Sequence, residues 1–164
     1  MSYDYRKVHL HKGMGLVGNV FDEETLKKLK GPIAIGHVRY STTGASQSKN
    51  IQPFMVKYSK GVLAVGHNGN LVKSKVLKDE LEDEGAIFQS TMDSEVIVHL
   101  IARSKKLKLE DAIIDGLSRV KGAYSLVFFT EDKIIAARDP RGFRPLCLGK
   151  LGDGYVVASE TCAF

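Results

Sequence analysis

The sequence lacks any apolar run long enough to cross a membrane. A membrane-spanning helix needs about 18 or more consecutive apolar residues, and no stretch of this 164-residue chain approaches that length. The first residues, Met1 to Arg6, are largely polar and contain no apolar signal segment. We therefore predict a cytoplasmic protein that has no membrane partner.

Cysteine is also scarce, and the chain contains no internal repeat or low-complexity tract. Cys147 and Cys162 are not spaced like metal ligands, and one possible pair is weak support for a disulfide. We expect both thiols to be reduced and structural. The remaining composition, 43% hydrophobic and 26% charged, indicates one globular domain that can bury a core.

The excess of basic residues does not form a nucleic-acid-binding pattern. The net charge is +5, but the lysines of segment 27–30 follow three acids at 22–24, and those of segment 105–108 precede two more acids. Such mixing is typical of solvated helix faces rather than of a basic groove. We predict that nucleic acid is not a partner.

Hydrophobic periodicity predicts strands near both ends of the chain and helices in the middle. A half-buried strand is expected at 7–12, with His9 and His11 exposed on its polar face. Helix signals mark segments 22–30, 71–85, 96–103 and 109–120. Further strands are expected at 33–38, 54–56, 62–65, 124–129, 133–137, 146–149 and 155–159. This order predicts an α+β domain in which helices are layered on antiparallel sheets.

The segment 66–71, Gly-His-Asn-Gly-Asn-Leu, joins the apolar strand 62–65 to the helix expected near Leu71. Asn-Gly is typical of a tight turn, because both residues tolerate positive φ. The side-chain amide of Asn68 and an exposed backbone N–H at Gly69 could also stabilise a developing oxyanion. A turn with no function is the alternative, and for an isolated Asn-Gly it is the favoured one.

Two charged residues lie where predicted elements end or begin. Arg39 follows an apolar strand and precedes a cluster of hydroxyls that includes Thr42. This setting suits capture of a small carboxylate or phosphate, and the alternative is a surface arginine bound to loop carbonyls. Asp93 precedes the helix expected at 96–103, where either Thr91 or Asp93 would cap the helix, and the alternative role of Asp93 is to receive an ammonium group.

Five motifs, taken together and in order, resemble the glutaminase domain of class II glutamine amidotransferases. The resemblance extends from about Lys7 to Phe164. Within the class it is strongest to the amidophosphoribosyltransferase branch, which begins purine synthesis, and the glucosamine-phosphate synthase branch is the alternative. The motifs are His37 to Thr42, His67 to Leu71, Thr91 to Glu95, Asp139 to Leu146, and Ala158 to Thr161.

The resemblance implies a fold and a set of site residues. The fold would be the four-layer αββα sandwich of N-terminal-nucleophile hydrolases, without its first strands. Residues 1–164 would form a single partial glutamine amidotransferase domain, with no phosphoribosyltransferase domain. In the site, Arg39 with Thr42 would hold the α-carboxylate of glutamine, Asp93 would receive its α-ammonium, and Asn68 with Gly69 would form the oxyanion hole. Arg141 and Arg144 would order a loop near this site.

The resemblance also implies what this chain does not supply. The nucleophile of the family is a cysteine at the mature N-terminus, whose own α-amine acts as the base, whereas this sequence begins Met1-Ser2-Tyr3. Neither Cys147 nor Cys162 has a free α-amine, so we expect the chain alone to be inactive. A nucleophile-free module for glutamine binding or assembly is the alternative.

Expected cofactors and partners follow from the same resemblance. We expect no cofactor in this chain, because the magnesium of the family, and the iron–sulfur cluster of some members, have their ligands elsewhere. The expected partners are glutamine and either a homo-oligomer or the missing part of the same enzyme.

Overall fold

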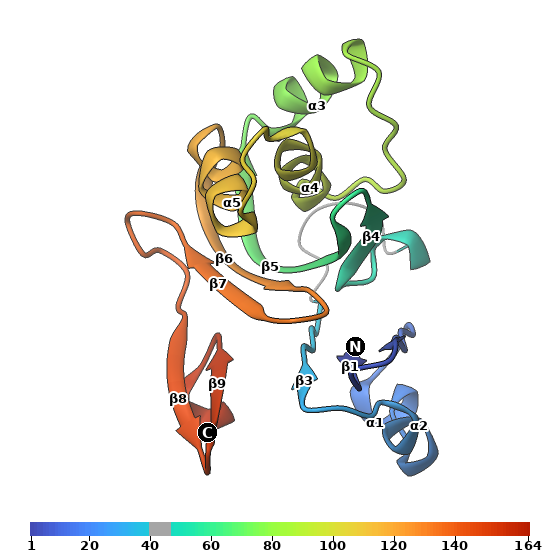
Figure 1. Cartoon of the computed structure of the whole chain (residues 1–164). Helices are drawn as coiled ribbons and strands as arrows, with labels where there is room; N and C mark the ends of the chain where they lie inside the picture. Colours follow the sequence, from blue (N-terminus) through green and yellow to red (C-terminus); the bar gives the residue numbers. More distant parts are fainter. Residues whose placement is uncertain (40–46) are drawn as a thin grey trace.

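A computed structural model describes residues 1–39 and 47–164 of the chain. In the described residues the strands form a four-stranded sheet of order β4-β5-β6-β7, a three-stranded sheet of order β2-β1-β3, and the hairpin β8-β9 (Figure 1). All strand pairs are antiparallel. The strands are β1 Ser2–Tyr3, β2 Val8–His9, β3 Ile33–Ala34, β4 Phe54–Tyr58, β5 Gly61–Val72, β6 Lys121–Phe129, β7 Ile134–Arg138, β8 Cys147–Leu151 and β9 Gly154–Ala158.

Helices lie on both sides of the strands. The longer helices α3, α4 and α5 cover one face of the four-stranded sheet, and the short helices α1 and α2 lie beside β1–β3 (Figure 1). Among the described helices, none is long and apolar enough to cross a membrane. The helices are α1 Val17–Val20, α2 Glu23–Lys28, α3 Ser74–Asp83, α4 Ser94–Arg103 and α5 Leu109–Ser118, with 3₁₀ turns η1 Ser48–Asn50 and η2 Thr161–Ala163.

The main core lies between the four-stranded sheet and helices α3–α5. Leu63 and Val65 of β5 point into it together with Ile97 of α4 and Leu126 of β6, and all four are fully buried. Alternate residues of β5 point to the opposite face, where Ala64 packs in a second cluster with residues of the N-terminal sheet. Both faces of β5 are therefore covered, and this explains why a continuous apolar run is suitable for its first half.

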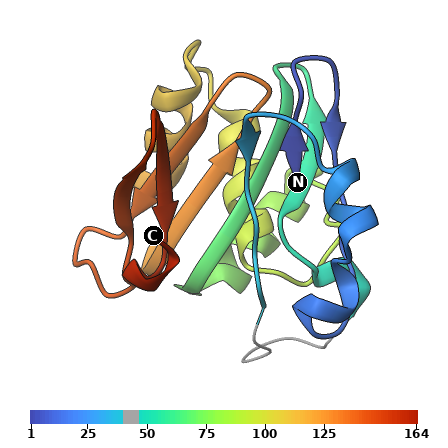
Figure 2. The ribbon, with the colours of Figure 1, turned by 90° about the horizontal axis from the view of Figure 1, so that it is seen from below.

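The second strand layer consists of two parts, sheet β2-β1-β3 and hairpin β8-β9. Seen from below, both parts lie in front of the four-stranded sheet, with β8-β9 at one side and β1–β3 at the other (Figure 2). Helices, sheet, second strand layer and the outer helices α1 and α2 together give the predicted αββα arrangement. The prediction of an α+β sandwich is therefore confirmed.

Several local predictions differ from the structure. Asn68 and Gly69 are not in a turn, because β5 continues to Val72 and Gly69 pairs with Tyr124 of β6. The following helix consequently begins at Ser74 rather than near residue 71. The strands predicted at 7–12 and 33–38 are shorter in the structure. β2 and β3 contain only two residues each, and the residues that flank them lie outside the sheet.

The two histidines of the N-terminal strand segment are half-buried rather than exposed. His9 Nε2 lies 2.7 Å from Asp4 Oδ2, and His11 Nε2 lies 2.9 Å from the Val20 carbonyl oxygen. The bond with His9, together with backbone bonds from Lys7 and Arg6, holds the pKa of the Asp4 carboxyl far below its usual range. Both histidines therefore make contacts within the N-terminal part of the chain.

Candidate functional site

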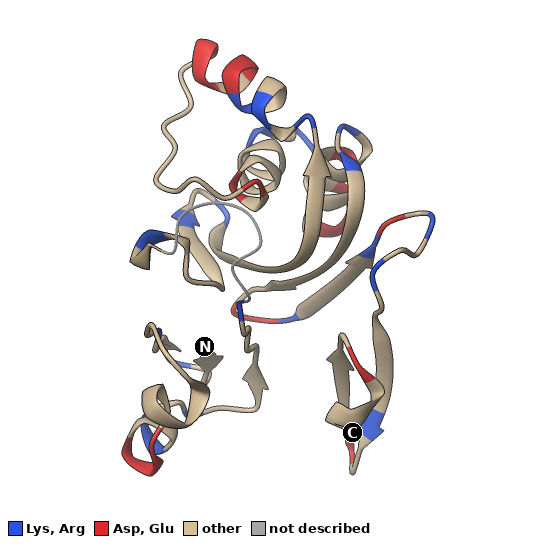
Figure 3. Cartoon of the chain, turned by 180° about the vertical axis from the view of Figure 1, so that it is seen from behind, with Lys and Arg blue, Asp and Glu red and all other residues tan. Residues whose placement is uncertain are grey.

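A cavity of about 1150 Å³ opens where β5 passes between the helical layer and the second strand layer. Its walls come from segments far apart in the sequence, so the fold rather than local structure creates it. The polar face of α3 and four chain segments line it, and these are Gly36–Arg39, His67–Leu71, Thr91–Asp93 and Ala158–Glu160. Figure 3 shows that acidic and basic residues occur on the same helices, α3 included.

The second half of β5 presents polar groups to both sides of the sheet. Successive side chains of a strand point to opposite faces, so His67 lies on the helical side and Asn68 on the side of the second strand layer. The His67 side chain contacts Asp93 at the start of α4. The Asn68 amide instead reaches Ser159, just after β9, with Nδ2 3.4 Å from Oγ. One strand therefore carries both parts of the site.

The carboxylate of Asp93 is held by two groups of β5. Its Oδ2 accepts a 2.8 Å hydrogen bond from the Leu71 backbone N–H, and its Oδ1 lies 3.3 Å from Nδ1 of His67. Burial raises the pKa of Asp93, but the bonds from His67 and Leu71 outweigh it and leave the pKa below its ordinary value. Asp93 makes no capping bond to α4. It is thus a fixed anion with a quarter of its side chain exposed.

Two side chains fix the backbone of His67: Gln52, which precedes β4, and His37, which follows β3. Its N–H donates to Gln52 Oε1 over 2.6 Å, and its carbonyl oxygen accepts from Nε2 of His37 over 3.0 Å. Burial lowers the pKa of His37, which keeps this ring neutral at pH 7. Because a carbonyl only accepts, the neutral His37 ring carries its proton on Nε2. The polar half of β5 is therefore held by side chains as well as by its sheet neighbours.

Gly69 is required by the backbone of the sheet itself. Its φ is +146°, and a Cβ atom at this position would lie 2.0 Å from the Ala123 carbonyl oxygen. The group that approaches the Gly69 backbone so closely is β6. This approach brings Gly69 to the cavity wall beside Asn68.

The loop after β7 connects the main sheet to the β8-β9 hairpin. Asp139 is 3% exposed, and its carboxylate accepts backbone hydrogen bonds from Tyr124, Arg141 and Phe143. Arg138 donates from Nε to the Arg144 carbonyl and from a terminal nitrogen to the Gly142 carbonyl. The loop is therefore ordered by Asp139 and Arg138, and not by the side chains of Arg141 and Arg144 as predicted. Arg144 instead lines the cavity.

Four of the five predicted site residues line the same cavity. Arg39, Asn68, Gly69 and Asp93 come together there from three separate segments. The fifth, Thr42, lies outside the described residues.

Three residues that contact the site were given no role from sequence, namely His67, Gln52 and Ser159. His67 and Ser159 do lie inside motifs that carry the resemblance. Gln52 has no motif, and only its position before an apolar strand could have drawn attention to it.

The cysteines differ in their relation to the cavity. Cys162 lines it and is exposed, and its Sγ lies 3.3 Å from Glu160 Oε2. The hydrogen bond and the charge of Glu160 raise the pKa of this thiol, which disfavours the thiolate at neutral pH. Cys147 is a free, half-buried thiol in β8.

Comparison with known proteins identifies the domain. Residues 37–164 match the family model of the glutamine amidotransferase domain. The chain is 51% identical over 165 residues to the amidophosphoribosyltransferase of Bacillus subtilis (strain 168), covering all of this chain and 35% of that protein. It is 55% identical over 152 residues to the chloroplastic amidophosphoribosyltransferase 1 of Arabidopsis thaliana, covering 92% of this chain and 27% of that protein. The chain thus spans about a third of the length of these relatives.

Solved structures give the same result. A structure described as the allosteric regulatory enzyme of purine biosynthesis superposes with a TM-score of 0.95 at 50% identity, over 99% of this chain and 35% of that one. The amidotransferase of B. subtilis, in complex with ADP and GMP, superposes with a TM-score of 0.92 at 49% identity, with the same coverage. By sequence and by fold, this chain belongs to the glutamine amidotransferase domain family and is similar to that domain of amidophosphoribosyltransferases.

Proposed function

We propose that the cavity binds L-glutamine and that this chain is the glutamine-using part of an amidophosphoribosyltransferase. The observation that carries the proposal is the convergence of a cation, a fixed anion and an amide donor on one cavity, from Arg39, Asp93 and Asn68. The α-carboxylate, α-ammonium and side-chain amide of glutamine have the complementary charges and hydrogen-bonding groups. The position of Thr42 in the sequence, close after Arg39, leads us to propose that it helps to bind the α-carboxylate.

The proposed groups act at different stages of the reaction. Arg39 and Asp93 contact parts of glutamine that do not change during amide cleavage, so they contribute equally to substrate and transition-state binding. Asn68 and the backbone N–H of Gly69 act where negative charge develops on the amide oxygen, so they contribute mainly in the transition state. We therefore assign affinity to the first pair and rate to the second.

We assign the attack on the amide carbon to a cysteine outside this chain, as the N-terminal cysteine of the family implies. The raised pKa of Cys162 and the position of Cys147 in a strand favour this assignment over either thiol of the chain. The thiol would pass its proton to its own α-amine as it adds to the amide carbon, and the resulting α-ammonium would return that proton to the leaving nitrogen, which departs as ammonia when the thioester forms. Water would then hydrolyse the thioester to release glutamate.

The use of ammonia and the larger assembly remain parts of the same proposal. The name of the relatives suggests that ammonia is transferred to phosphoribosyl pyrophosphate, in a domain outside this chain. On the resemblance to the family alone, we propose that the ligands of the magnesium, and of any iron–sulfur cluster, lie outside this chain. We further propose a homo-oligomer in the cytoplasm and no nucleic-acid partner.

Calorimetric titration with a series of ligands tests the proposed substrate. We expect L-glutamine to bind at one site, and D-glutamine and butyramide, which lacks both α-groups, to bind at least tenfold more weakly. The α-groups should matter because each meets an opposite charge. Equal affinity for L-glutamine and butyramide, or no binding of L-glutamine, would contradict the proposal.

Replacement of Asp93 by asparagine should weaken L-glutamine binding by about 10- to 100-fold, because a hydrogen bond between charged groups contributes about 1.5–3 kcal/mol. The pKa of Asp93 lies below its ordinary value, so wild-type affinity should stay constant from pH 7 to about pH 4 and fall below that. Calorimetry over this pH range measures both effects.

Asp83 provides a matched control, because it is exposed at the end of α3 and does not line the cavity. Asp83→Asn should bind L-glutamine like the wild type. If Asp93→Asn bound as tightly as this control, Asp93 would have no part in binding the ammonium group.

A further inference from the structure

Glu95 is a buried carboxylate that does not line the cavity. It lies in the first turn of α4 with 1% of its surface exposed. A charged side chain is rarely buried to this extent without partners. Its partners therefore indicate what it does.

The partners of Glu95 lie in the chain that leads into α4. Oε1 accepts from the Gln89 backbone N–H over 2.7 Å, and Oε2 accepts from the Ser90 N–H over 2.8 Å and the Ser90 hydroxyl over 2.6 Å. Glu95 is not the glutamate of a capping box, because that residue lies three positions after the N-cap, which here is Asp93, and Glu95 lies only two after it. Glu95 binds the segment that precedes Asp93, whereas the Asp93 carboxylate binds groups of β5.

Glu95 is an acceptor only. Burial raises its pKa, but the nearby His99 ring and the hydrogen bonds from Gln89 and Ser90 outweigh this and hold the pKa below its ordinary value. His99 Nε2 lies 3.8 Å from Oε1, one turn along α4, and the His99 ring packs against Phe88 with centroids 4.4 Å apart. Both carboxylate oxygens of Glu95 thus accept hydrogen bonds from the segment that connects to α4.

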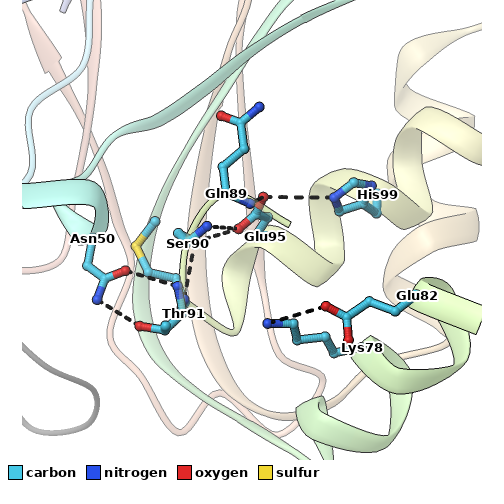
Figure 4. Close-up of polar contacts among 9 residues, drawn as sticks. Asn50, Lys78, Glu82, Gln89, Ser90, Thr91, Glu95 and His99 are labelled. Carbon is cyan, nitrogen blue, oxygen red and sulfur yellow. Dashed lines mark hydrogen bonds and ion pairs between the residues drawn. The ribbon is translucent and has the colours of Figure 1, made fainter. Parts of the chain in front are cut away.

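The segment between Ser90 and Asp93 is fixed at further points (Figure 4). Asn50 donates from Nδ2 to Thr91 Oγ1 over 2.8 Å and accepts from the Thr91 N–H over 3.1 Å. The Met92 N–H donates to the Ser90 hydroxyl oxygen over 3.2 Å, and that hydroxyl itself donates to Glu95. A continuous series of bonds therefore runs from Glu95 to the residue before Asp93.

We propose that Glu95 is the positioning residue of Asp93: it fixes residues 89–92 so that the Asp93 carboxylate meets Leu71 and His67 and faces the cavity. The inference rests on the proposed glutamine site for its functional consequence. Its structural part does not, because the hydrogen bond from the Leu71 N–H to Asp93 reports the position of the carboxylate without any ligand.

Glu95→Gln is the most informative variant. It keeps the size of the side chain but places an NH₂ group where three donors converge, so one oxygen is lost whichever way the amide turns. We expect the Leu71 amide proton to exchange with solvent at least tenfold faster and its NMR shift to move. L-Glutamine should bind about tenfold more weakly, and kcat of an active hybrid with the B. subtilis relative should change less than KM.

Two further variants separate positioning from general stability. Ile113→Val removes a buried methylene from α5, so it should lower the melting temperature without changing the Leu71 amide shift or glutamine affinity. Ser90→Ala removes one donor to Glu95 and keeps its charge, so it should act in the same direction as Glu95→Gln but less strongly. It also serves if Glu95→Gln does not fold.

A double-mutant cycle completes the test. If Glu95 acts through Asp93, Glu95→Gln should weaken binding by less than twofold in the Asp93→Asn background. Additive losses, or an unchanged Leu71 amide in folded Glu95→Gln and Ser90→Ala, would overturn the inference. Failure of the wild type to bind L-glutamine would overturn the proposed function, whereas faster Leu71 exchange in Glu95→Gln would still support the positioning role.

Discussion

Asn68→Ala is expected to lower kcat for glutamine hydrolysis by about 10²–10³ while KM stays within about twofold. Asn68 points to the second strand layer, and its Nδ2 lies 3.4 Å from Ser159 Oγ, a long bond that the amide can exchange for a stronger one. Its donor matters most when the tetrahedral oxyanion forms, so the loss should appear in the chemical step. The assay needs a nucleophile, which a hybrid with the flanking segments of the B. subtilis relative supplies.

The same hybrid carries the control for this prediction. Asn19 is exposed in α1 and does not line the cavity, so Asn19→Ala should leave both kinetic constants unchanged. A near-normal kcat for Asn68→Ala, accompanied only by a lower melting temperature, would show that Asn68 is structural. A large rise in KM at constant kcat would show that it binds the substrate but does not stabilise the oxyanion.

Gly69→Ala is expected to lower the free energy of unfolding by about 2–6 kcal/mol, through two effects. At a φ of +146° an L side chain is strained, which costs about 1–3 kcal/mol. The new Cβ would also lie 2.0 Å from the Ala123 carbonyl oxygen, so β5 and β6 must move apart, at a further cost of about 1–3 kcal/mol. Urea denaturation followed by circular dichroism measures the difference.

Gly18 is the matched control, because it lies in α1 and a Cβ there meets no atom within 4 Å. Gly18→Ala should keep or slightly raise stability, since alanine favours a helix by up to about 1 kcal/mol over glycine. A loss below about 1 kcal/mol for Gly69→Ala would mean that the approach of β5 to β6 does not require glycine. Rate measurements on this variant would not isolate the oxyanion role, because the strand itself moves.

Sequence patterns predicted well those elements whose partners are close along the chain. The α2 helix begins after Asp22, whose side chain accepts from the Thr25 N–H as its position suggested. β6 and β7, and β8 and β9, form hairpins in the regions where four strands were predicted close together along the chain. In each case the local signal and the tertiary structure agree.

The prediction of a turn at Asn68-Gly69 was wrong because distant partners outweigh local preference. Asn-Gly favours a turn in isolation, but Gly69 pairs with Tyr124 of β6, which lies more than fifty residues later in the sequence. The same limit applies to the loop after β7, where Asp139 and Arg138 make the bonds that the neighbouring arginines were expected to make.

The site shows a similar division. The charged residues Arg39 and Asp93 stand out in sequence because they follow or precede apolar elements. The group that holds Asp93, His67, does not stand out, and neither does Gln52, which holds the His67 backbone. Both are polar residues whose burial depends on how β3, β5 and α4 pack. Glu95 is hidden for the same reason, because in sequence it is one of several acids near a helix start.

A crystal structure of this chain with L-glutamine tests the central claim most directly. We expect one glutamine in the cavity, with its α-carboxylate at Arg39, its α-ammonium at Asp93 and its side-chain carbonyl oxygen within about 3 Å of Asn68 Nδ2 and the Gly69 nitrogen. Glutamine bound elsewhere, or bound in the cavity with its side-chain amide away from Asn68 and Gly69, would contradict the claim.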